Sequence, residues 1–548
     1  MTAALQFLRV IAPCAAMMVL SACGGGGGDS PSVPNYDVTS TAGGGGTVTP
    51  AAQAVGAGGS ATFTVTPNAG YVVSAVTGCG GSLSGSIYTT GALNANCTVT
   101  ATFSAAFTWV SGANSTDATG VYGTRGVAAA ANMPGSRDGG TTWTDASGNL
   151  WLFGGFAGYA NALNAATGNF MNDLWEYSPS NGEWTWIGGS STACAQGVYG
   201  TQGVAAAANI PGPRSATSTW TDSRGNVWVF GGGGCDSTGA FRWYDDLWKF
   251  SPSNAEWTWV GGSTAANVNA VYGNEGVAAA TNTPGGRGGF AKWTDVDGNL
   301  WLFGGSAWDG ATSSEADLND LWEYSPSTGQ WTWVGGANTF NAGGNYGTQG
   351  TPAGTNVPGA RWAALSWTDA KGNFWLFGGI GHDSAGQAGE LNDLWEYSPS
   401  TGEWTWVNGS STANATGVYG AQGVAAAVNV PTPRDSAATW VDAAGDLWLF
   451  GGEGYLVSTR YYHRLNDLWK FSPASGEWTW VAGSNSFDAT GVYGTQGVAA
   501  AADVPGARAA IISWQDTGGN AWLFGGYTYD DPTNTRFEMS DLWKYPTK

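Results

Sequence analysis

The chain is poor in positive charge, in histidine and in long apolar runs. Its 548 residues include 19 Lys and Arg against 40 Asp and Glu, and only 2 His. This balance argues against nucleic acid or an anionic membrane surface as a partner, because both are bound through basic patches. After the N-terminal leader-like segment, no stretch is long and apolar enough to span a bilayer.

Motifs of several catalytic classes are also missing. The 6 cysteines contain no Cys-x-x-Cys spacing, which argues against a thiolate zinc site. The glycine pairs do not precede helices, so none of them forms a phosphate-binding loop. We find no nucleophile motif and no calcium-loop spacing. The sequence therefore predicts no metal and no cofactor, and it indicates no catalytic residue.

The chain is rich instead in one repeat. Each copy has an arginine, then an aromatic run followed by two glycines, then an Asp-Leu-Trp triplet. The six arginines recur at intervals of 73 to 77 residues, at Arg137, Arg214, Arg287, Arg361, Arg434 and Arg508. Self-similarity at a fixed period indicates one supersecondary unit whose copies bury their faces against one another.

Each copy has the pattern of four strands. In copy three, Trp293 marks the first strand, and the apolar run 300–303 suits a second strand covered on both faces. The glycine pair is expected to end that strand. Residues 321–324 form the third strand, and the aromatic-polar alternation at 331–334 suits an outer strand. Four strands per unit, arranged radially, make a propeller blade.

The two ends of the repeat array predict a closed ring. Copy six lacks its fourth strand, and a matching Phe-Thr-Trp-Val run lies ahead of copy one, at 107–110. A strand from the N-terminal side can therefore complete the last blade and leave no open sheet edge. The predicted fold class is all-β: a six-bladed β-propeller over residues 106–548, closed by an N-terminal strand and preceded by a small all-β domain.

The Gly-Gly, Asp-Leu-Trp-Glu-Tyr and Trp pattern resembles kelch repeats, as in the propeller of galactose oxidase-like proteins. The period is longer than the ~50 residues of a typical kelch repeat. The resemblance implies a scaffold that hosts adaptors, oxidases and sugar isomerases alike. Tyr462 and His463 resemble the tandem Tyr-His copper ligands of that family. The other histidine, His382, precedes this pair where the family places it after, so copper chemistry is not expected.

The N-terminal part is predicted to contain three segments. Residues 1–23 have the layout of a secretory signal, and their Leu-Ser-Ala-Cys ending resembles a lipobox that would leave Cys23 lipidated; an ordinary cleaved signal peptide is the alternative. Residues 24–35 form a glycine-rich flexible linker. Residues 36–105 form a small all-β module, since 97–103 alternates like a strand with one buried face. This module resembles the internalin-type B repeats of bacterial surface proteins.

Four cysteines outside the leader are expected to form disulfides. Cys79 and Cys97 would join within the small domain. Cys194 lies in the connection entering blade two and Cys235 in that blade's b–c loop, and both loops emerge on one face. An oxidising compartment allows both bonds, although sequence alone leaves the connectivity open.

Candidate binding residues lie on the face that carries the long d–a loops and the varied b–c loops, where binding sites generally occur. The six arginines could converge on a carboxylate or phosphate, or each could bond a carboxylate of its own blade. Three tryptophans outside the repeat pattern could stack on a sugar or anchor a protein, or pack on their own loops: Trp243, Trp308 and Trp362. The b–c loop carboxylates are expected to form a solvated rim: Asp309, Glu315, Asp317, Asp383, Glu390, Asp530 and Asp531.

These features predict a monomeric lipoprotein of the cell envelope, anchored to the bacterial outer membrane or cell surface by its lipid. It would bind an unidentified protein or glycan through the loop-bearing face, and the sequence favours this binding role over catalysis without deciding between them. The alternative is a carbohydrate-active enzyme, mutarotase- or lyase-like, on the same propeller. An enzyme should bring acid, base and arginine together in one closed pocket near the axis. A binding protein should spread its carboxylates around an open aromatic rim.

Overall fold

The computed structural model describes residues 33–547, apart from 158–168, 266, 457–460 and 531–534. The predicted signal peptide with Cys23 and most of the predicted linker lie outside these residues. Throughout the described ranges the regular secondary structure is β-strand. Within them, no helix has the length and hydropathy needed to cross a membrane.

The chain divides into two compact units. The first contains the residues up to Gly43 together with Thr47–Thr66 and Ala75–Ala101, and the second contains Gly44–Gly46, Pro67–Ser74 and everything from Thr102 onward. Strands of the N-terminal region form two sheets, in the orders β3-β1-β8-β5 and β2-β4-β7-β6. Their bounds are β1 (Asn35–Ala42), β2 (Gly46–Thr49), β3 (Ala52–Gly56), β4 (Thr62–Pro67), β5 (Tyr71–Thr77), β6 (Ser82–Ser84), β7 (Ile87–Thr89) and β8 (Cys97–Ala105).

Apolar residues that alternate with polar ones along the strands form the core of this small unit. In β8, buried Val99 and Ala101 alternate with exposed threonines, as predicted. Val38 of β1 and Phe63 of β4 are also buried. The disulfide between Cys79 and Cys97 is present.

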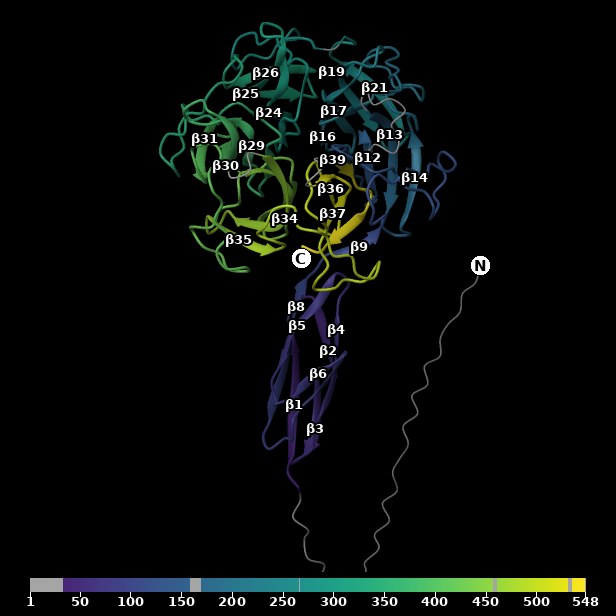
Figure 1. The fold of residues 1–548 in the computed structure, drawn as a ribbon, viewed down its shortest axis with the longest axis vertical. Helices are drawn as coiled ribbons and strands as arrows, with labels where there is room; N and C mark the ends of the chain where they lie inside the picture. Colours follow the sequence, from purple (N-terminus) through teal and green to yellow (C-terminus); the bar gives the residue numbers. More distant parts are fainter. Residues whose placement is uncertain (1–32, 158–168, 266, 457–460, 531–534, 548) are drawn as a thin grey trace, which may run out of the picture. The chain divides into compact units, whose positions relative to one another are not determined.

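The second unit is a six-bladed β-propeller whose blades stand in a ring (Figure 1). Blade one has β10 (Arg137–Asp138), β11 (Thr141–Thr144), β12 (Leu150–Ala157), β13 (Phe170–Ser178) and β14 (Glu183–Gly188). Blade two has β15 (Arg214–Ser215), β16 (Ser218–Thr221), β17 (Val227–Phe230), β18 (Gly233–Cys235), β19 (Phe241–Trp243), β20 (Leu247–Ser251) and β21 (Glu256–Gly261). Blade three has β22 (Arg287–Gly288), β23 (Ala291–Thr294), β24 (Leu300–Asp309), β25 (Ser314–Ser325) and β26 (Gln330–Gly335).

The remaining three blades repeat the arrangement. Blade four has β27 (Arg361–Trp362), β28 (Leu365–Thr368), β29 (Phe374–His382), β30 (Ala388–Ser398) and β31 (Glu403–Asn408). Blade five has β32 (Ala438–Val441), β33 (Leu447–Leu456), β34 (Tyr461–Ser472) and β35 (Glu477–Ala482). Blade six has β36 (Ile512–Gln515), β37 (Ala521–Phe524), the hairpin β38 (Tyr527–Asp530) and β39 (Thr535–Glu538), and β40 (Leu542–Tyr545).

The predicted closure is confirmed. Strand β9 (Thr108–Ser111) pairs antiparallel with β40, so a segment from ahead of the first repeat completes the sixth sheet. In Figure 1 this blue strand lies beside the yellow strands of the last blade. Every sheet of the ring therefore has its outer strand, as the sequence predicted.

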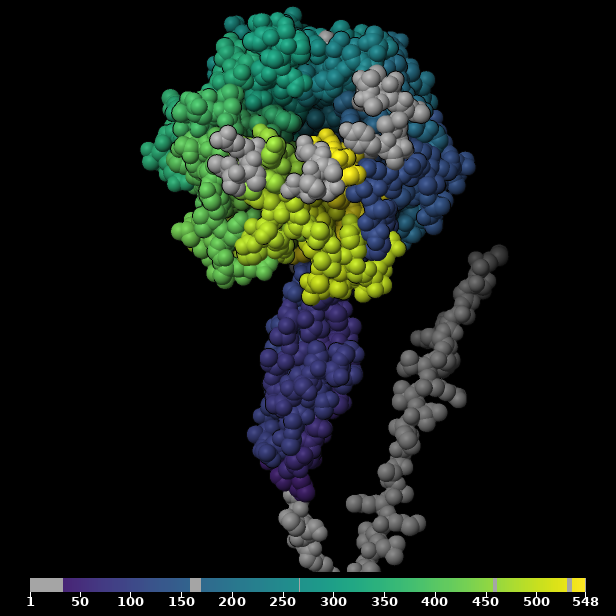
Figure 2. Space-filling model, in the orientation of Figure 1, coloured from purple at the N-terminus to yellow at the C-terminus, as the bar shows by residue number. Residues whose placement is uncertain are grey.

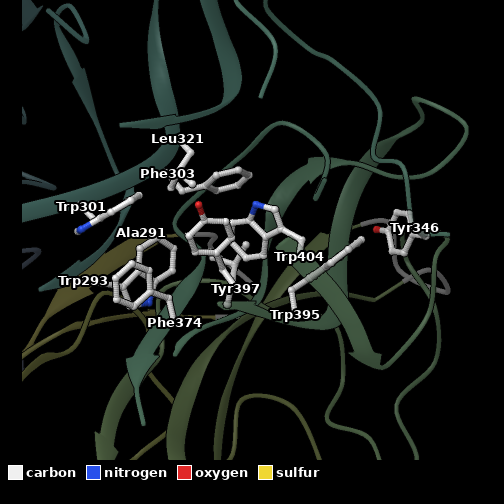
Figure 3. Close-up of a cluster of buried hydrophobic side chains, with 11 residues drawn as sticks. Ala291, Trp293, Trp301, Phe303, Leu321, Tyr346, Phe374, Trp395, Tyr397 and Trp404 are labelled. Carbon is white, nitrogen blue, oxygen red and sulfur yellow. The ribbon is translucent and has the colours of Figure 1, made fainter. Parts of the chain in front are cut away.

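Adjacent blades are joined by aromatic packing. Between blades three and four, Trp293 stacks on Phe374 with ring centroids 5.2 Å apart and an interplanar angle of 7° (Figure 3). The indole Nε1 of Trp293 also donates to the carbonyl of Trp375, 3.2 Å away in the next blade. The same bond runs from Trp220 to Trp301. The repeat-wide tryptophans are thus both packing units and hydrogen-bond donors.

In four blades the glycine pair does not end the second strand, so that expectation was wrong there, whereas β17 and β37 of blades two and six do end just before the pair. In blade three, β24 continues through Gly304 and Gly305 to Asp309, with a register shift between Phe303 and Gly305. Gly304 has a φ of +68°, and a Cβ there would lie 2.7 Å from the carbonyl oxygen of Arg361 in the next blade. Glycine therefore serves a β-bulge at which neighbouring blades approach closely.

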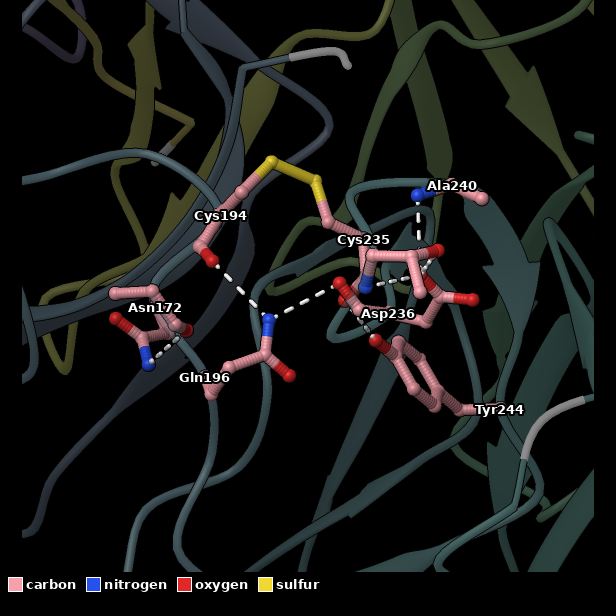
Figure 4. Close-up of a disulfide and its surroundings, with 9 residues drawn as sticks. Asn172, Cys194, Gln196, Cys235, Asp236, Ala240 and Tyr244 are labelled. Carbon is pink, nitrogen blue, oxygen red and sulfur yellow. Dashed lines mark hydrogen bonds between the residues drawn. A yellow bond between two sulfur atoms is a disulfide. The ribbon is translucent and has the colours of Figure 1, made fainter.

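The predicted disulfide between Cys194 and Cys235 is also present (Figure 4). Beside it, the Gln196 side chain donates from Nε2 to the carbonyls of Cys194, at 3.2 Å, and Asp236, at 3.0 Å. The bond and this amide bridge join the connection entering blade two to the end of β18.

Candidate functional site

The six repeat arginines lie inside the blades. In blade three, Arg287 donates from its two terminal nitrogens to the two carboxylate oxygens of Asp320, at 2.6 and 2.9 Å. The same carboxylate accepts from the Trp322 indole and the Tyr272 hydroxyl. Arg287 also donates to the carbonyl of Gly304 in the bulge. One ion pair thereby links the connecting loop, the second strand and the third strand of the blade.

All six copies contain the same buried pair. The partners are Arg137 and Asp173, Arg214 and Asp246, Arg287 and Asp320, Arg361 and Asp393, Arg434 and Asp467, and Arg508 and Asp541, with side chains at most 1% exposed. These contacts support the alternative that each arginine bonds a carboxylate of its own blade. The bidentate pair occupies the edge of the guanidinium that an anionic ligand would use.

A cavity of about 960 Å³ lies at the centre of the propeller, between the first strands and the loop-bearing ends of the blades. Figure 2 shows the surface receding between the teal and yellow parts of the ring. Trp243 and Trp362 line this cavity, whereas Trp308 lies outside it and is 37% exposed. The volume falls within the range of ~300–1,000 Å³ typical of small-molecule pockets.

Three positions per blade contribute to this cavity wall all around the ring. They are the residue after the arginine, the residue after the glycine pair, and the residue three before the Asp-Leu-Trp aspartate. We call them the rim triplet. In every blade, the residue after the glycine pair lies opposite both of the other two positions on the neighbouring strands. The three side chains therefore stand on one face of the sheet.

The rim triplets differ from blade to blade, while the residues beside them repeat. From blade one to blade six they are Asp138, Phe156 and Phe170; Ser215, Gly233 and Trp243; Gly288, Ser306 and Asp317; Trp362, Ile380 and Glu390; Asp435, Glu453 and Arg464; and Ala509, Tyr527 and Glu538. Most of these residues line the cavity. The wall is therefore aromatic on one side and charged on the other.

The aromatic side comes from blades one and two. Phe156 and Phe170 meet edge to face with centroids 5.2 Å apart, Phe170 lies 5.6 Å from Phe241, and Phe241 meets Trp243 edge to face at 5.0 Å. All four rings line the cavity. They form one continuous aromatic wall of the kind on which an apolar sugar face can pack.

The charged side comes from blades five, six and one. Glu453 accepts from the Tyr527 hydroxyl and from Arg464, whose Nη2 lies 3.1 Å from the carboxylate. Arg536 of β39 lies over the Tyr527 ring, 4.0 Å from its centroid, and pairs with Asp138. Acid, arginine and tyrosine groups therefore meet at one side of the cavity.

Glu390 and Asp435 form a carboxyl pair beside this group. Both are buried, and Asp435 lines the cavity. Among the described residues, no N–H or hydroxyl group donates to the Glu390 oxygens, and Asp435 lies within hydrogen-bonding reach of them. Burial, and then the charge of Glu453, raises the pKa of Asp435 to about 7. Burial raises the pKa of Glu390 well above its usual range. The pair therefore retains a proton near neutral pH.

Other loop carboxylates divide between structural and cavity positions. Asp383 is buried and accepts three backbone N–H bonds, from Ala385, Gln387 and Ala413, so it holds a turn. Asp317 lines the cavity, and burial raises its pKa to about 7. The expectation of a solvated rim is wrong for Asp383 and Glu390. Asp531 lies outside the described residues.

The two histidines are not arranged as a metal centre. His463 bonds Asp488 through Nδ1, and His382 lies with Nε2 4.0 Å from Asp317. Across the described part of the chain, no group of three or more His, Cys, Asp or Glu side chains is placed to hold a metal ion.

Sequence reasoning missed the charged side of the cavity. Asp435, Glu453, Arg464, Tyr527 and Arg536 were not among the candidates. The signal lay in the repeat itself, because the rim positions vary at fixed offsets from landmarks that do not vary. That signal could be recognised only once the strands were known to continue past the glycine pair.

Comparison with known proteins matches part of the chain. Residues 36–107 match the family model of the divergent InlB B-repeat domain. No curated protein sequence matches the chain. Among solved structures, one titled "Structure of YjhT" shares 14% sequence identity, with a TM-score of 0.43, covering 75% of this chain and 95% of that one. The surface-repeat module and the two disulfides indicate an extracellular or cell-surface protein.

Proposed function

We propose that the propeller is a kelch-type binding module that holds a saccharide in its central cavity. The observation that carries this proposal is the division of one concave wall into an aromatic side and a charged side. Pyranose rings have an apolar face and a rim of hydroxyls, so they need both kinds of surface. Aromatic rings pack on the apolar face, and carboxylate, arginine and tyrosine side chains form hydrogen bonds with the hydroxyls.

A small ligand fits this site better than a protein partner does. A stable protein interface buries roughly 800 Å² per partner over a broad patch. The site here is concave and its polar groups converge on an interior volume. A protein partner would need to insert a side chain or a loop to reach the rim triplets.

The setting of this module is part of the proposal. Residues 1–23 would direct export and leave Cys23 lipidated at the membrane surface. Residues 24–35 and the surface-repeat module would then act as tether and spacer. The propeller would present its cavity in the cell envelope as a monomer, without nucleic acid or a cofactor.

Two exposed aromatic side chains provide a test with a matched control. Phe241 lines the cavity and is 39% exposed, whereas Trp308 is 37% exposed and lies outside it. We would titrate the protein with neutral and acidic glycosides and follow its thermal unfolding. A ligand at a hundred times its dissociation constant should add ~2.7 kcal/mol of stability. Phe241→Ala should weaken binding and Trp308→Ala should not; equal losses, or no binding to wild type, would contradict the proposal.

Acid–base chemistry on the bound sugar is a second candidate, favoured by the Glu390–Asp435 pair. A carboxyl group that titrates near pH 7 can donate or accept a proton at the working pH. A mutarotase- or lyase-like reaction would use that property. The test is the rate of anomer interconversion of reducing sugars, measured by magnetisation-transfer NMR. An enzyme should lose roughly 10²- to 10⁴-fold in rate in Asp435→Asn, whereas a wild-type rate equal to the uncatalysed one would leave binding alone.

A further inference from the structure

At one position of the first strand, which lies at the floor of the cavity, blade three has a different residue type from the other five blades. The residue before the first-strand tryptophan bears a hydroxyl in five blades, as Thr142, Thr219, Ser366, Thr439 and Ser513, and it is Lys292 in blade three. Thr142 donates to the carbonyl of Ser513 at 2.8 Å, and Thr219 to that of Thr142 at 2.7 Å. Lys292 makes the equivalent bond to Thr219, also at 2.8 Å. The lysine thus keeps the inter-blade bond and adds a charge.

Among the residues that the structure describes, none supplies an anionic partner for that charge. Both hydrogen-bond acceptors of the Lys292 ammonium belong to Thr219: its carbonyl, and its hydroxyl at 3.3 Å. The arginines of the propeller interior differ, since each buried repeat arginine pairs with a carboxylate, as do Arg464 and the partly exposed Arg536. Burial lowers the pKa of Lys292 to about 8, and no neighbouring carboxylate acts to raise it. At pH 7 the amine is still mostly protonated.

Lys292 is half-buried, and an ammonium held partly away from water without a counter-charge is costly unless something compensates for it. Lys292 lines the same cavity as the aromatic wall and the charged rim, so a bound ligand can reach it. The rim does not exclude an anion, because raised pKa values leave Asp317 and Asp435 partly protonated at neutral pH. Arg464 and Arg536 further reduce the negative charge of the rim.

We propose that Lys292 is the anion subsite of the cavity and binds the carboxylate of an acidic saccharide. The inference rests on the proposed saccharide site and specifies its ligand class. The ammonium donates its remaining N–H to the carboxylate at the floor, and the sugar ring packs between the aromatic wall and the charged rim.

Two glycosides that differ only in the carboxylate test this subsite: methyl glucuronide and methyl glucoside. Calorimetric titration of the full chain would give both dissociation constants for wild type, Lys292→Thr and Lys292→Met. Threonine is the residue of three other blades at this position, and methionine keeps the length of the side chain without its charge. Wild type should prefer the glucuronide by roughly 10- to 100-fold, the value of a charge-assisted hydrogen bond. Both variants should lose that preference and still bind the glucoside.

The outcomes separate the two proposals. If wild type binds both glycosides equally, or if both variants keep the preference, Lys292 is not an anion subsite and the saccharide site stands. If wild type binds neither glycoside, the saccharide site fails and the subsite fails with it. A melting temperature near that of wild type confirms that the variants are folded.

Discussion

Trp109 lies opposite Trp543 in the sixth blade, although the two residues come from opposite ends of the propeller sequence. Two residues before Trp109, Phe107 is buried against Phe450, Trp543 and Tyr545. The closing strand is therefore held by a backbone ladder and by a side chain packed between blades five and six.

Phe107→Ala should weaken this closure. Loss of a buried phenylalanine costs ~3–5 kcal/mol, so we expect a loss of that order in the free energy of unfolding of the propeller. Tryptophan fluorescence during urea titration is a selective probe, because all 32 tryptophans follow residue 106. Val110 lies on the same closing strand but is only half-buried, so Val110→Ala should cost less. Equal effects would mean that Phe107 does not secure the ring.

The buried arginine pairs predict an asymmetry between single and double substitution. Removing one partner of a buried ion pair leaves an uncompensated charge and costs ~3–5 kcal/mol. Asp320→Leu should therefore destabilise the propeller strongly, whereas Arg287→Met combined with Asp320→Leu should restore part of the loss. Chemical denaturation of wild type and of these two variants measures this. A double variant less stable than the single one would show that the pair acts mainly through its hydrogen bonds to Gly304, Tyr272 and Trp322.

Alanine substitution at two glycines with similar φ angles can distinguish the cost of backbone strain from the cost of a steric clash. Gly304 has a φ of +68° and Gly298 a φ of +83°, but a Cβ at Gly298 would meet nothing within 4 Å. Gly298→Ala should cost only ~1–2 kcal/mol, the cost of a left-handed alanine. Gly304→Ala should cost clearly more, because its Cβ would press on the Arg361 carbonyl of the next blade. If the melting temperatures of the two variants fall equally, the close approach of neighbouring blades is not the reason for the glycine pair.

The carboxyl pair predicts a pH dependence of stability. Folding raises the pKa of Asp435 from its ordinary value of about 3.9 to about 7. The folded state then binds more protons than the unfolded state between these values, so this group lowers stability as pH rises through the interval. Asp435→Asn should gain stability relative to wild type from pH 4 to pH 7 and change little beyond. A stability difference that does not vary with pH would mean that Asp435 titrates normally.

The sequence predicted the scaffold well because the scaffold repeats. Each blade repeats the same three landmarks, which are the arginine, the glycine pair and the Asp-Leu-Trp triplet. The missing fourth strand of the last copy predicted the closure. The cavity was harder to predict because its residues depend on register. Glycine pairs were interpreted as strand ends, which placed Glu390 and Asp317 in solvated loops, whereas the bulge carries both strands further and aligns the rim triplets. Lys292 escaped notice for a simpler reason, since a single unpaired lysine has no motif.

The closing strand has a mechanical consequence. Strand β8 ends at Ala105 and β9 begins at Thr108, so only two residues separate the small unit's last strand from the ring. Any tension transmitted along the chain from the N-terminal side must therefore enter the propeller at β9. The ladder between β9 and β40, with Phe107 ahead of it, is then the first part of the ring to bear that load. The contacts that close the ring are therefore also the ones through which a pulling force reaches it.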